Sequence, residues 1–305
     1  MDPPRHLAVG NINVDMYLVV PRLPGPDEAV AASTAYVGPG GAASNYAVAA
    51  SRAGHRSSLL AHTGRLALSL GVLEALERSG VDVSLVRVHE DELPGIAVVL
   101  LESGGQRAMV KLVGANRLLT GDEELGGGFD VAHVASVHPR VALRVASRRP
   151  ARLHSYDPGG AAPQLRGHVE ELRGLLDVLY VNRVEFRKVF GVEPSPLAAA
   201  EAAARLEAIV VVKLGGDGAL AASPRGDLLR VEAIRVEAVD TTGAGDVFDA
   251  YMNAWLAEGR SLGEALQAAA VAAGLKVARR GAQSAPSRRE VEERLQRGPP
   301  RLQRL

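Results

Sequence analysis

The sequence predicts an α/β protein whose mostly parallel central sheet is covered by helices on both faces. From residue 129 onward, short apolar runs alternate with segments of helical periodicity, and such alternation is typical of parallel sheets. Polar, glycine-rich segments follow several of the apolar runs, where open α/β sheets bind ligands beyond the carboxyl ends of their strands. The chain has 305 residues and 47% hydrophobic content, so we expect one large domain over residues 1–305.

The N-terminal part begins with a short apolar run, His6–Gly10, which we interpret as a buried strand. The apolar pieces between Val14 and Val37 are interrupted by prolines, and we expect them to form hairpin-like edge strands. The other elements expected before residue 129 are the helices Ala42–Ala53 and Leu68–Gly80 and the strands Leu59–Ala61, Val86–Val88, Ile96–Leu101 and Met109–Val113, the last of them after a turn at 103–105.

The C-terminal part contains the alternating pattern. The expected strands are Val131–Ala135, Arg152–Tyr156, Val178–Val181 and Ile209–Leu214, and the expected helices between them are Pro139–Ser147, Leu165–Leu175, Val184–Phe190 and Pro196–Leu206. Ser261 with Glu264, and Ser287 with Glu290, have the spacing of capping boxes, which predicts helices beginning at about residues 262 and 288. Beyond the second of these helices, we expect the arginine-rich end of the chain to fray.

The composition excludes several classes of protein. The formal net charge is +0, from 35 basic and 35 acidic residues, which argues against a nucleic-acid partner bound through phosphate neutralisation. The absence of cysteine excludes disulfides, thiolate metal sites and a cysteine nucleophile. No long apolar run or signal-peptide pattern is present, so a cytoplasmic enzyme without a membrane partner is expected. Sparse Asn and Gln with plentiful Arg, Glu and Ala are typical of a thermophile and equally of GC-rich coding.

The most informative stretch is the turn Asp240–Asp246, which follows the apolar segment Val231–Val239 and precedes a helix-patterned run. Its small residues at 243–245 allow backbone N–H groups to approach an anion at a helix N-terminus, where the helix dipole favours negative charge. The carboxylate of Asp246 can accept a proton from an attacking hydroxyl. This combination suits phosphoryl transfer, which depends on positioning and charge stabilisation. The glycines alone also fit an ordinary turn that enters a helix.

Together with Val247 and Phe248, this turn resembles the second signature of the ribokinase-like (PfkB) family of carbohydrate and nucleoside kinases, roughly Asp-Thr-x-Gly-Ala-Gly-Asp-x-Phe. The resemblance implies a ribokinase-like three-layer α/β/α fold with a mostly parallel central sheet and a small β-sheet lid. It assigns Asp246 as the catalytic base, and Gly243, Ala244 and Gly245 as the anion hole for the transferring phosphoryl group. It covers most of the chain, with the motifs in the family's order.

Two N-terminal motifs contain the candidate substrate-binding residues. Residues 38–45, Gly-Pro-Gly-Gly-Ala-Ala-Ser-Asn, resemble the family's first signature, which implies that Gly40, Gly41 and Asn45 contact substrate hydroxyls. Residues 10–15 place alternate polar side chains on one side of an extended segment. The family has a substrate-binding aspartate here, preceded in ribokinase-type members by an asparagine, and these positions correspond to Asp15 and Asn13. A flexible turn with a helix cap and a polar turn are the alternative interpretations.

Two further motifs follow expected strands and resemble nucleotide- and metal-binding segments. Residues 182–185 match the family's Asn-x-x-Glu motif, which implies that Asn182 and Glu185 hold Mg²⁺ through water, although a helix cap has the same pattern. Residues 211–218 resemble the ATP-contacting loop, so Lys213, Gly215 and Gly218 are candidate ATP-binding residues, with Gly245 beside them. Lys213 stands where a small hydroxyl residue is common, and its ammonium could reach a phosphate or point to solvent.

The loop Ala278–Ser284 resembles the one that, with the aspartate matching Asp240, forms a monovalent-cation site in ribokinase-like members. The resemblance therefore raises potassium dependence as a hypothesis. A glycine-rich surface turn is the alternative. Because such sites use mostly backbone carbonyls, the side chains of this loop do not decide between the two.

We therefore expect a kinase that uses ATP and Mg²⁺ to phosphorylate a hydroxymethyl group of a small sugar, such as ribose, fructose or 2-keto-3-deoxygluconate. A nucleoside is the alternative acceptor, because Tyr17, Tyr36 and Tyr46 flank the substrate motifs and could stack a base. A non-catalytic sugar or nucleotide sensor on the same fold is a further alternative. We expect residues 14–37 and 95–113 to form a lid that excludes water. Such lids often pair edge to edge, so a homodimer is expected.

Overall fold

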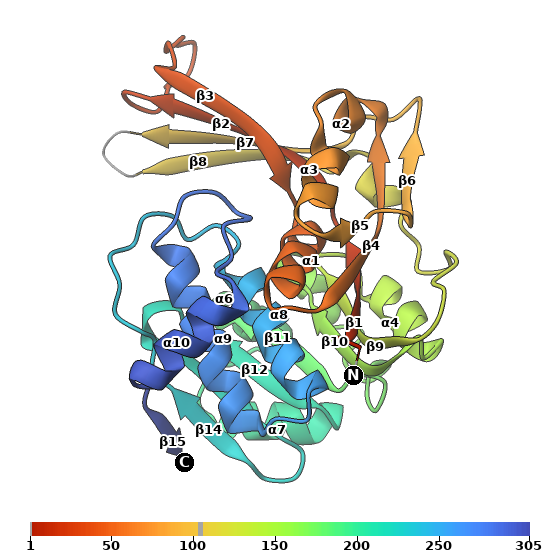
Figure 1. The fold of residues 1–305 in the computed structure, drawn as a ribbon, viewed down its shortest axis with the longest axis vertical. Coiled ribbons are helices and arrows are strands. Elements are labelled where there is room, and N and C mark those ends of the chain that lie inside the picture. Colours follow the sequence, from red (N-terminus) through yellow and green to blue (C-terminus); the bar gives the residue numbers. More distant parts are fainter. Residues whose placement is uncertain (1, 103–105) are drawn as a thin grey trace.

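The central sheet of the computed structural model, which describes residues 2–102 and 106–305, is mostly parallel (Figure 1). In order across the sheet its strands are β15 (Leu302–Arg304), β14 (Leu228–Val231), β13 (Ala219–Ala222), β12 (Ile209–Lys213), β11 (Val178–Asn182), β10 (Ala151–Asp157), β9 (Phe129–Ala135), β1 (Arg5–Gly10), β4 (Arg56–Gly64) and β5 (Val81–Asp82), and β6 (Val86–His89) also pairs with β4. Neighbours from β12 to β5 pair in parallel, and those from β12 to β15 pair antiparallel. The predicted mostly parallel sheet is confirmed.

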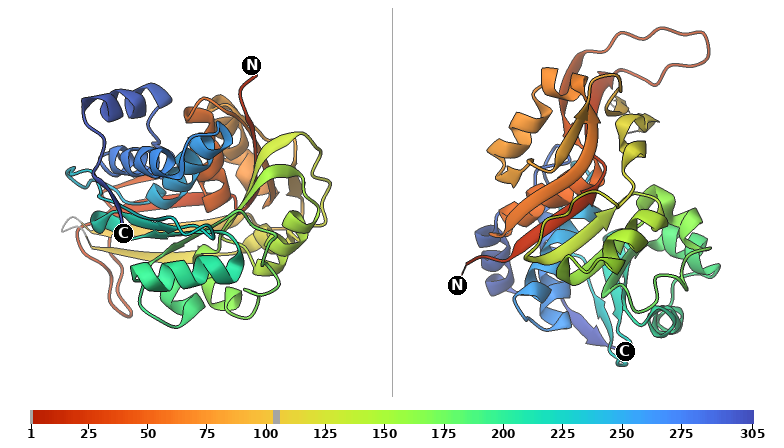
Figure 2. Two further views of the ribbon diagram at one scale, coloured as in Figure 1. Left: turned by 90° about the horizontal axis from the view of Figure 1, so that it is seen from below. Right: turned by 90° about the vertical axis from the view of Figure 1, so that its right-hand side faces the viewer.

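Helices cover both faces of this sheet, as Figure 2 shows. On one face, apolar residues such as Ala8 and Val211 pack against α1 (Ala42–Arg52), α3 (Val72–Arg78), α8 (Ala244–Ala257), α9 (Leu262–Val277) and α10 (Arg288–Arg297). On the other, their strand neighbours Leu7 and Val210 pack against α4 (Pro139–Ser147), α5 (Ala162–Leu165), α6 (Arg183–Phe190) and α7 (Pro196–Leu206). Because successive strand side chains point to opposite faces, the continuous apolar strands supply both cores. The three-layer α/β/α fold is confirmed.

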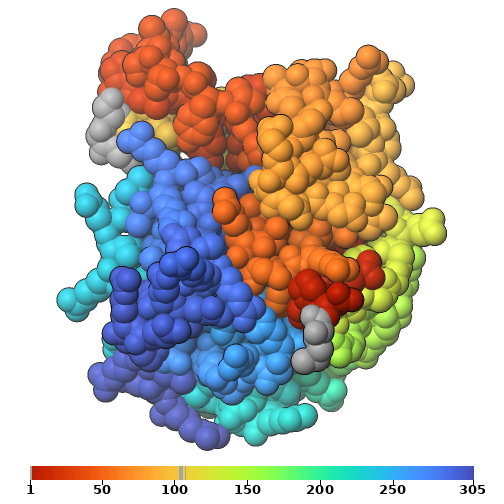
Figure 3. Space-filling model, in the orientation of Figure 1, coloured from red at the N-terminus to blue at the C-terminus, as the bar shows by residue number. Residues whose placement is uncertain are grey.

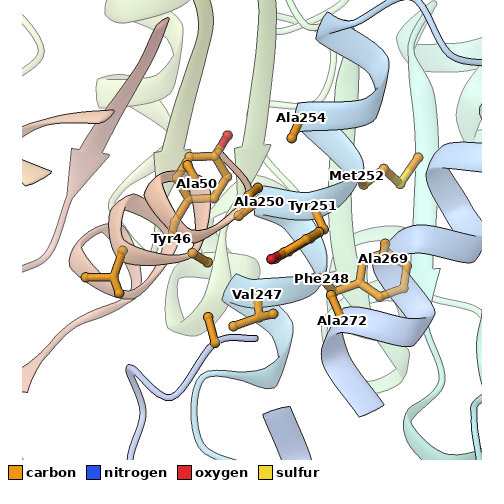
Figure 4. Close-up of a cluster of buried hydrophobic side chains, with 14 of the residues drawn as sticks. Tyr46, Ala50, Val247, Phe248, Ala250, Tyr251, Met252, Ala254, Ala269 and Ala272 are labelled. Atoms are coloured by element: carbon orange, nitrogen blue, oxygen red, sulfur yellow. The ribbon is translucent and has the colours of Figure 1, made fainter. Parts of the chain in front are cut away.

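The packing of α8 decides where the candidate catalytic turn lies. Its buried side chains, among them Phe248, Tyr251 and Met252, pack between α1 and α9 (Figure 4). The Tyr251 hydroxyl donates a hydrogen bond to the carbonyl oxygen of Pro286 over 2.7 Å. A helix buried from Val247 to Trp255 is held on several sides, so its N-terminus is fixed relative to the sheet.

A second sheet of four strands projects from one end of the molecule (Figure 1). Its order is β3 (Thr34–Gly40), β2 (Asn13–Val20), β7 (Gly95–Glu102) and β8 (Arg107–Leu112). These strands come largely from the two segments expected to form the lid, 14–37 and 95–113. In Figure 3 this small sheet overhangs the C-terminal loops, which are drawn in blue. The turn predicted at 103–105 lies outside the described residues.

The structure corrects two predicted helices. The expected helix Leu68–Gly80 is two helices, α2 (Arg65–Ser69) and α3, because Gly71 between them adopts a left-handed φ of 67°. The expected helix Leu165–Leu175 is also wrong. Helix α5 ends at Leu165, and residues 166–175 form successive turns that include Gly174 with a φ of 69°. Apolar periodicity predicted burial here, and Leu172 is buried, but the left-handed backbone at Gly174 is incompatible with a helix that continues to residue 175.

Two further expectations about the C-terminal part are also corrected. The chain end does not fray, because Leu302–Arg304 pairs with β14 as an antiparallel edge strand. The turn Asp240–Asp246 does not directly follow a strand. β14 ends at Val231, and residues 232–239 form an irregular segment whose end reaches α9, where the N–H groups of Val239 and Asp240 both donate to the carbonyl oxygen of Val277.

Candidate active site

The turn Asp240–Asp246 leads directly into α8. Gly243 caps this helix with a φ of 79°, which L-residues rarely adopt. A Cβ at Gly243 would also lie 2.4 Å from the carbonyl oxygen of Ala282. Both its conformation and the available space therefore require glycine at this position. The first N–H groups of α8 have no intrahelical partners, and this arrangement at a helix N-terminus favours an anion.

Asp240 joins this turn to the loop Ala278–Ser284. Its Oδ1 accepts a hydrogen bond from the N–H of Thr242 and its Oδ2 one from the N–H of Gly281, each over 2.9 Å. Its carbonyl oxygen accepts a third from the ammonium of Lys276 over 2.7 Å. Burial opposes ionisation of Asp240, but the hydrogen bonds and the Lys276 charge hold its pKa below the ordinary value. The carboxylate of Asp240 therefore organises the turn.

Asp246, in the first turn of α8, meets the N-terminal motif. The Asn45 side-chain amide in α1 donates a hydrogen bond to Asp246 Oδ2 over 2.8 Å. Burial raises the pKa of Asp246 to about 6, and the charge of Asp157 adds to this effect. A carboxylate with a pKa near neutrality is suited to general-base work. The structure thus brings together two candidate residues that lie far apart in the sequence.

Asp15 lies beside the same site on β2. A Cβ at Gly40 would come within 2.2 Å of the Asp15 carboxylate atoms, and one at Gly41 would lie 2.4 Å from the carbonyl oxygen of Asn11. The two glycines therefore allow the strand and the polar segment to approach closely. Asp15 Oδ1 and Asn45 Oδ1 are buried and have no hydrogen-bond partner among the described residues. Burial raises the pKa of Asp15 to about 6, against the opposing charge of Lys111.

Asn13 contacts a residue that the sequence analysis missed. Its Oδ1 accepts a hydrogen bond from the Asn116 amide over 2.9 Å, and Asn116 Oδ1 accepts one from the N–H of Ile12 over 3.0 Å. Asn116 is buried and lies in a short 3₁₀ helix, Gly114–Leu118. The Gly-Ala-Asn run at 114–116 carried no periodicity or charge signal that pointed to this contact.

A cavity of about 290 Å³ lies between the small sheet and the C-terminal loop, lined by Asp15, Tyr17, Tyr36, Arg280 and Gln283 among others. The rings of Tyr17 and Tyr36 stack at 4.4 Å between centroids and 7° between planes. Tyr46 does not line this cavity. It is fully buried, stacks on His133 and accepts a hydrogen bond from Asn253, so the expectation that it could stack a base is wrong.

Asn182 and Glu185 form a capping box at the start of α6. Asn182 Oδ1 accepts a hydrogen bond from the N–H of Glu185 over 3.0 Å, and Glu185 Oε2 accepts one from the N–H of Asn182 over 2.8 Å. Burial and the charge of Asp157 raise the pKa of Glu185 to about 7. A nearby cation would relieve this unfavourable charge, so the site fits a divalent ion. In residues 2–102 and 106–305, no group of three or more carboxylates and histidines forms a dedicated metal cage, and Mg²⁺ characteristically keeps its waters.

Lys213, at the carboxyl end of β12, does not point to solvent. Its ammonium donates to Asp157 Oδ2 over 2.6 Å and to the two carboxylate oxygens of Asp249 over 2.9 and 3.0 Å. It also borders the anion-binding turn, because a Cβ at Gly245 would lie 3.2 Å from Nζ. The alternative in which the Lys213 ammonium points to solvent is therefore wrong, and its reach to a phosphate stays a prediction.

Asp157 and Asp249 are the other residues that sequence reasoning did not assign. Asp249 follows Asp246 by three residues in α8 and is fully buried, a position where a helix normally presents an apolar side chain to the core. A buried charge requires a partner, and an acidic residue in this otherwise apolar helix was the available signal. Asp157 lies at the end of β10, where it pairs with Ala135 at the end of β9.

The glycines of the loop after β12 differ in what they contribute. Gly218 has a φ of 87°, and a Cβ there would lie 1.9 Å from the carbonyl oxygen of Val231. The hairpin between β12 and β13 therefore requires this glycine. Gly215 has a φ of 64° and no atom within 4 Å of an added Cβ, so space for a ligand remains at its side of the loop.

Comparison with known proteins agrees with this geometry. Residues 4–289 match the pfkB family of carbohydrate kinases. The chain is 27% identical in sequence to the ribokinase of Haemophilus influenzae. The alignment covers 95% of this chain and 97% of that protein. It is 30% identical to an ATP-dependent ribose-1-phosphate kinase of Halopiger xanaduensis, in an alignment that covers 93% of this chain and 95% of that protein.

Solved structures show the same fold. A nucleoside kinase of Methanocaldococcus jannaschii superimposes with a TM-score of 0.87 at 23% identity, over 97% of this chain and 100% of that one. Arabidopsis thaliana ribokinase, solved with ribose and ATP, gives a TM-score of 0.78 at 26% identity, over 96% and 98% of the two chains. The match over nearly the whole chain identifies an ATP-dependent phosphotransferase that acts on an alcohol group of a sugar or nucleoside, and the chain belongs to the pfkB family of carbohydrate kinases.

Proposed function

We propose that this kinase transfers the γ-phosphoryl group of ATP to a hydroxymethyl group of a small sugar, with Asp246 as the base. The observation that carries the proposal is the 2.8 Å hydrogen bond between Asn45 and Asp246. It places the carboxylate of the anion-binding turn against the motif expected to hold the acceptor. Asp246 would take the proton of the hydroxyl as the phosphoryl group arrives. Asn45 orients the base and would also reach the substrate.

The N–H groups of Gly243, Ala244 and Gly245 would stabilise the charge on the transferring phosphoryl group. Lys213 supplements them, since its ammonium borders Gly245 and carries a fixed positive charge. The open side of the Gly215 loop would receive ATP, while Gly218 shapes the hairpin behind it. Each of these roles requires only positioned donors and charges, as phosphoryl transfer does.

Asn182 and Glu185 would hold Mg²⁺ through water. A bound Mg²⁺ would neutralise charge on the phosphate oxygens of ATP. The raised pKa of Glu185, about 7, supports this role, because a carboxylate that lacks a cation is poorly ionised there. Glu185 itself would orient the ion's water shell with the carboxylate oxygen that does not cap the helix.

The acceptor side favours a sugar, held by Asn13, Asp15, Gly40, Gly41 and Asn45. Two cations face this side. Lys111 shares a cross-strand row with Ala97 and Asp15, so it lies on the same face of the small sheet, and Arg280 lines the cavity. Such charges suit an acceptor with an anionic group, such as the ribose 1-phosphate named for the Halopiger relative. Ribose itself, fructose and 2-keto-3-deoxygluconate remain in the acceptor panel.

A nucleoside is the second candidate acceptor, and one observation favours it. The stacked Tyr17–Tyr36 pair lines the cavity beside Asp15, and a base could stack on the exposed Tyr36 ring. A non-catalytic sensor is a weaker alternative, because it would not need a buried carboxylate with a raised pKa at an anion-binding turn.

The small sheet would act as a lid over the cavity, formed by about residues 14–37 and 95–113. Its outer face, opposite the Asp15 face, exposes Val37, Val110 and Leu112, which are 49%, 71% and 46% exposed. An apolar sheet face of this kind suits a second copy of the chain, which supports the expected homodimer.

In the described ranges, 2–102 and 106–305, no helix is suited to crossing a bilayer.

A coupled assay of ADP release tests the proposal. With ATP and Mg²⁺, the panel contains ribose, ribose 1-phosphate, fructose, 2-keto-3-deoxygluconate, inositol and common nucleosides. We expect one sugar or sugar phosphate to exceed every nucleoside in kcat/KM by at least tenfold. A nucleoside as the best acceptor would overturn the sugar assignment, and the absence of turnover with every acceptor would favour the sensor.

A further inference from the structure

Lys276 is a fully buried cation that none of the proposed catalytic steps uses. It lies in the last turn of α9 and is 0% exposed. Its ammonium donates a hydrogen bond to the carbonyl oxygen of Asp240 over 2.7 Å. This places a positive charge between the turn that begins at Asp240 and the loop Ala278–Ser284, which is where the sequence resemblance locates a monovalent-cation site.

Hydrogen bonds hold the groups around Lys276 in a fixed arrangement. Both carboxylate oxygens of Asp240 accept backbone hydrogen bonds, from Thr242 and Gly281, which fix the orientation of this carboxylate. Burial lowers the pKa of Lys276 below its ordinary value, and the negative charges of Asp240 and Asp246 oppose this effect and favour the ammonium form. A buried ammonium needs such compensation, because removing it from water is costly.

The residues present therefore do not fit a bound potassium ion at the carbonyl oxygen of Asp240. An ammonium and K⁺ are both monovalent cations that carbonyl oxygens can solvate, and two of them cannot occupy one position. We propose that the Lys276 ammonium replaces the monovalent cation, and that this kinase needs no potassium. A tethered cation is present at every salt concentration and is held by the fold rather than by a binding equilibrium.

The Lys276 ammonium helps to fix the position of the turn Asp240–Asp246. Lys276 holds the first residue of the anion-binding turn from one side, while Gly281 and Thr242 hold its carboxylate. The turn would then keep its shape without an added ion. Lys276 is thus a positioning residue, since it acts on the phosphoryl-binding N–H groups through Asp240 rather than by touching substrate.

Two measurements test the proposal at constant ionic strength, comparing KCl with tetramethylammonium chloride. The first is turnover, which rests on the proposed function, and the second is the melting temperature, which does not. We expect the wild-type kcat to change less than twofold and its Tm to stay the same. An increase of tenfold or more in wild-type kcat with K⁺, or a rise in its Tm specific to K⁺, would overturn the proposal.

The variant Lys276→Ala removes the ammonium and opens space beside the Asp240 carbonyl. We expect its kcat to fall at least tenfold without K⁺ and to recover with K⁺, and its Tm to rise by roughly 2–4 °C in KCl. Lys276→Met fills the space with an apolar chain, so K⁺ should rescue neither quantity. Lys188→Ala, which alters an exposed lysine of α6, is the matched control and should show neither effect.

Should Lys276→Ala prove too unstable to purify, the wild-type comparison still decides. If no acceptor in the panel is phosphorylated, the Tm arm alone decides, which separates a failure of this inference from a failure of the proposed function. A stable Lys276→Ala variant that binds ATP and responds to K⁺ in neither kcat nor Tm would also refute the replacement.

Discussion

Replacing Asp249 by asparagine should change the stability of the protein little, whereas replacing Asp157 or Lys213 should cost about 3–5 kcal/mol. The difference follows from how charge is divided among three buried groups. Burial raises the pKa of Asp249 well above its ordinary value. Burial also opposes ionisation of Asp157, but the adjacent Lys213 charge holds the pKa of Asp157 below its ordinary value. Within the cluster, the Lys213 ammonium therefore finds its main counter-charge in Asp157, whereas burial opposes the charged form of Asp249.

The contacts within this cluster determine how much unfolding free energy each substitution should cost. Lys213 Nζ lies 2.6 Å from Asp157 Oδ2 and 2.9 Å from Asp249 Oδ1, and Asp249 also shares a hydrogen bond with Asp157. Asp157→Asn leaves the Lys213 ammonium without its counter-charge, and Lys213→Met leaves the Asp157 carboxylate buried and unpaired. Asp249→Asn removes a carboxyl group whose charged form burial already opposes, and the amide can still donate to Asp157, so about 1 kcal/mol or less should be lost.

Urea unfolding followed by tryptophan fluorescence measures these changes, because Trp255 is the single tryptophan and lies in α8, 5% exposed. The midpoint shift at constant slope gives the change in unfolding free energy. A loss for Asp249→Asn as large as that for Asp157→Asn would refute the charge assignment.

Three other predictions follow from the geometry. The kcat should fall as the pH drops below about 6, since the pKa of Asp246 is raised to about 6 and the base must be deprotonated to act; a flat kcat profile between pH 5 and 7 would remove Asp246 from this role. Gly243→Ala should cost about 1–3 kcal/mol in urea unfolding and raise the KM for ATP, because it forces a side chain into a φ of 79°, while Gly127→Ala, with open space around it, should behave as wild type. Val110→Glu should convert the dimer into a monomer in light scattering, because it charges a side chain that is 71% exposed on the outer sheet face; a wild-type monomer, or a dimeric variant, would contradict the proposed interface.

The sequence predicted the layers of this fold because continuous apolar strands and periodic helices encode burial directly. The helix Pro196–Leu206 lies where its periodicity indicated, and the helices after Ser261 and Ser287 begin where their capping boxes indicated. The expected helix at 165–175 failed because periodicity detects a buried face, not whether glycines permit the backbone to be helical. The strand at Leu302–Arg304 was missed because its pairing depends on a partner, β14, that lies far away in the sequence.

In the candidate site, too, local patterns could be predicted from the sequence, whereas contacts between distant segments could not. The turn with Asp246 and the pair Asn182–Glu185 are local patterns, and the sequence located both. Asn116, Asp157, Asp249 and Lys276 act through contacts between distant segments, and a buried ion pair leaves only an isolated charge in an apolar run. Lys213 was noticed as a departure from the family pattern, but its two carboxylate partners became apparent only when β10, β12 and α8 were placed together.

The most direct test of the central claim is the kcat of Asp246→Asn with the best acceptor from the panel, measured beside the affinity for ATP by calorimetry. We predict that kcat falls by about 10²–10⁴-fold while ATP binds as in the wild type, because the amide keeps the shape of the site and removes only the base. A kcat close to that of the wild type would contradict the assignment of Asp246 as the base of this kinase.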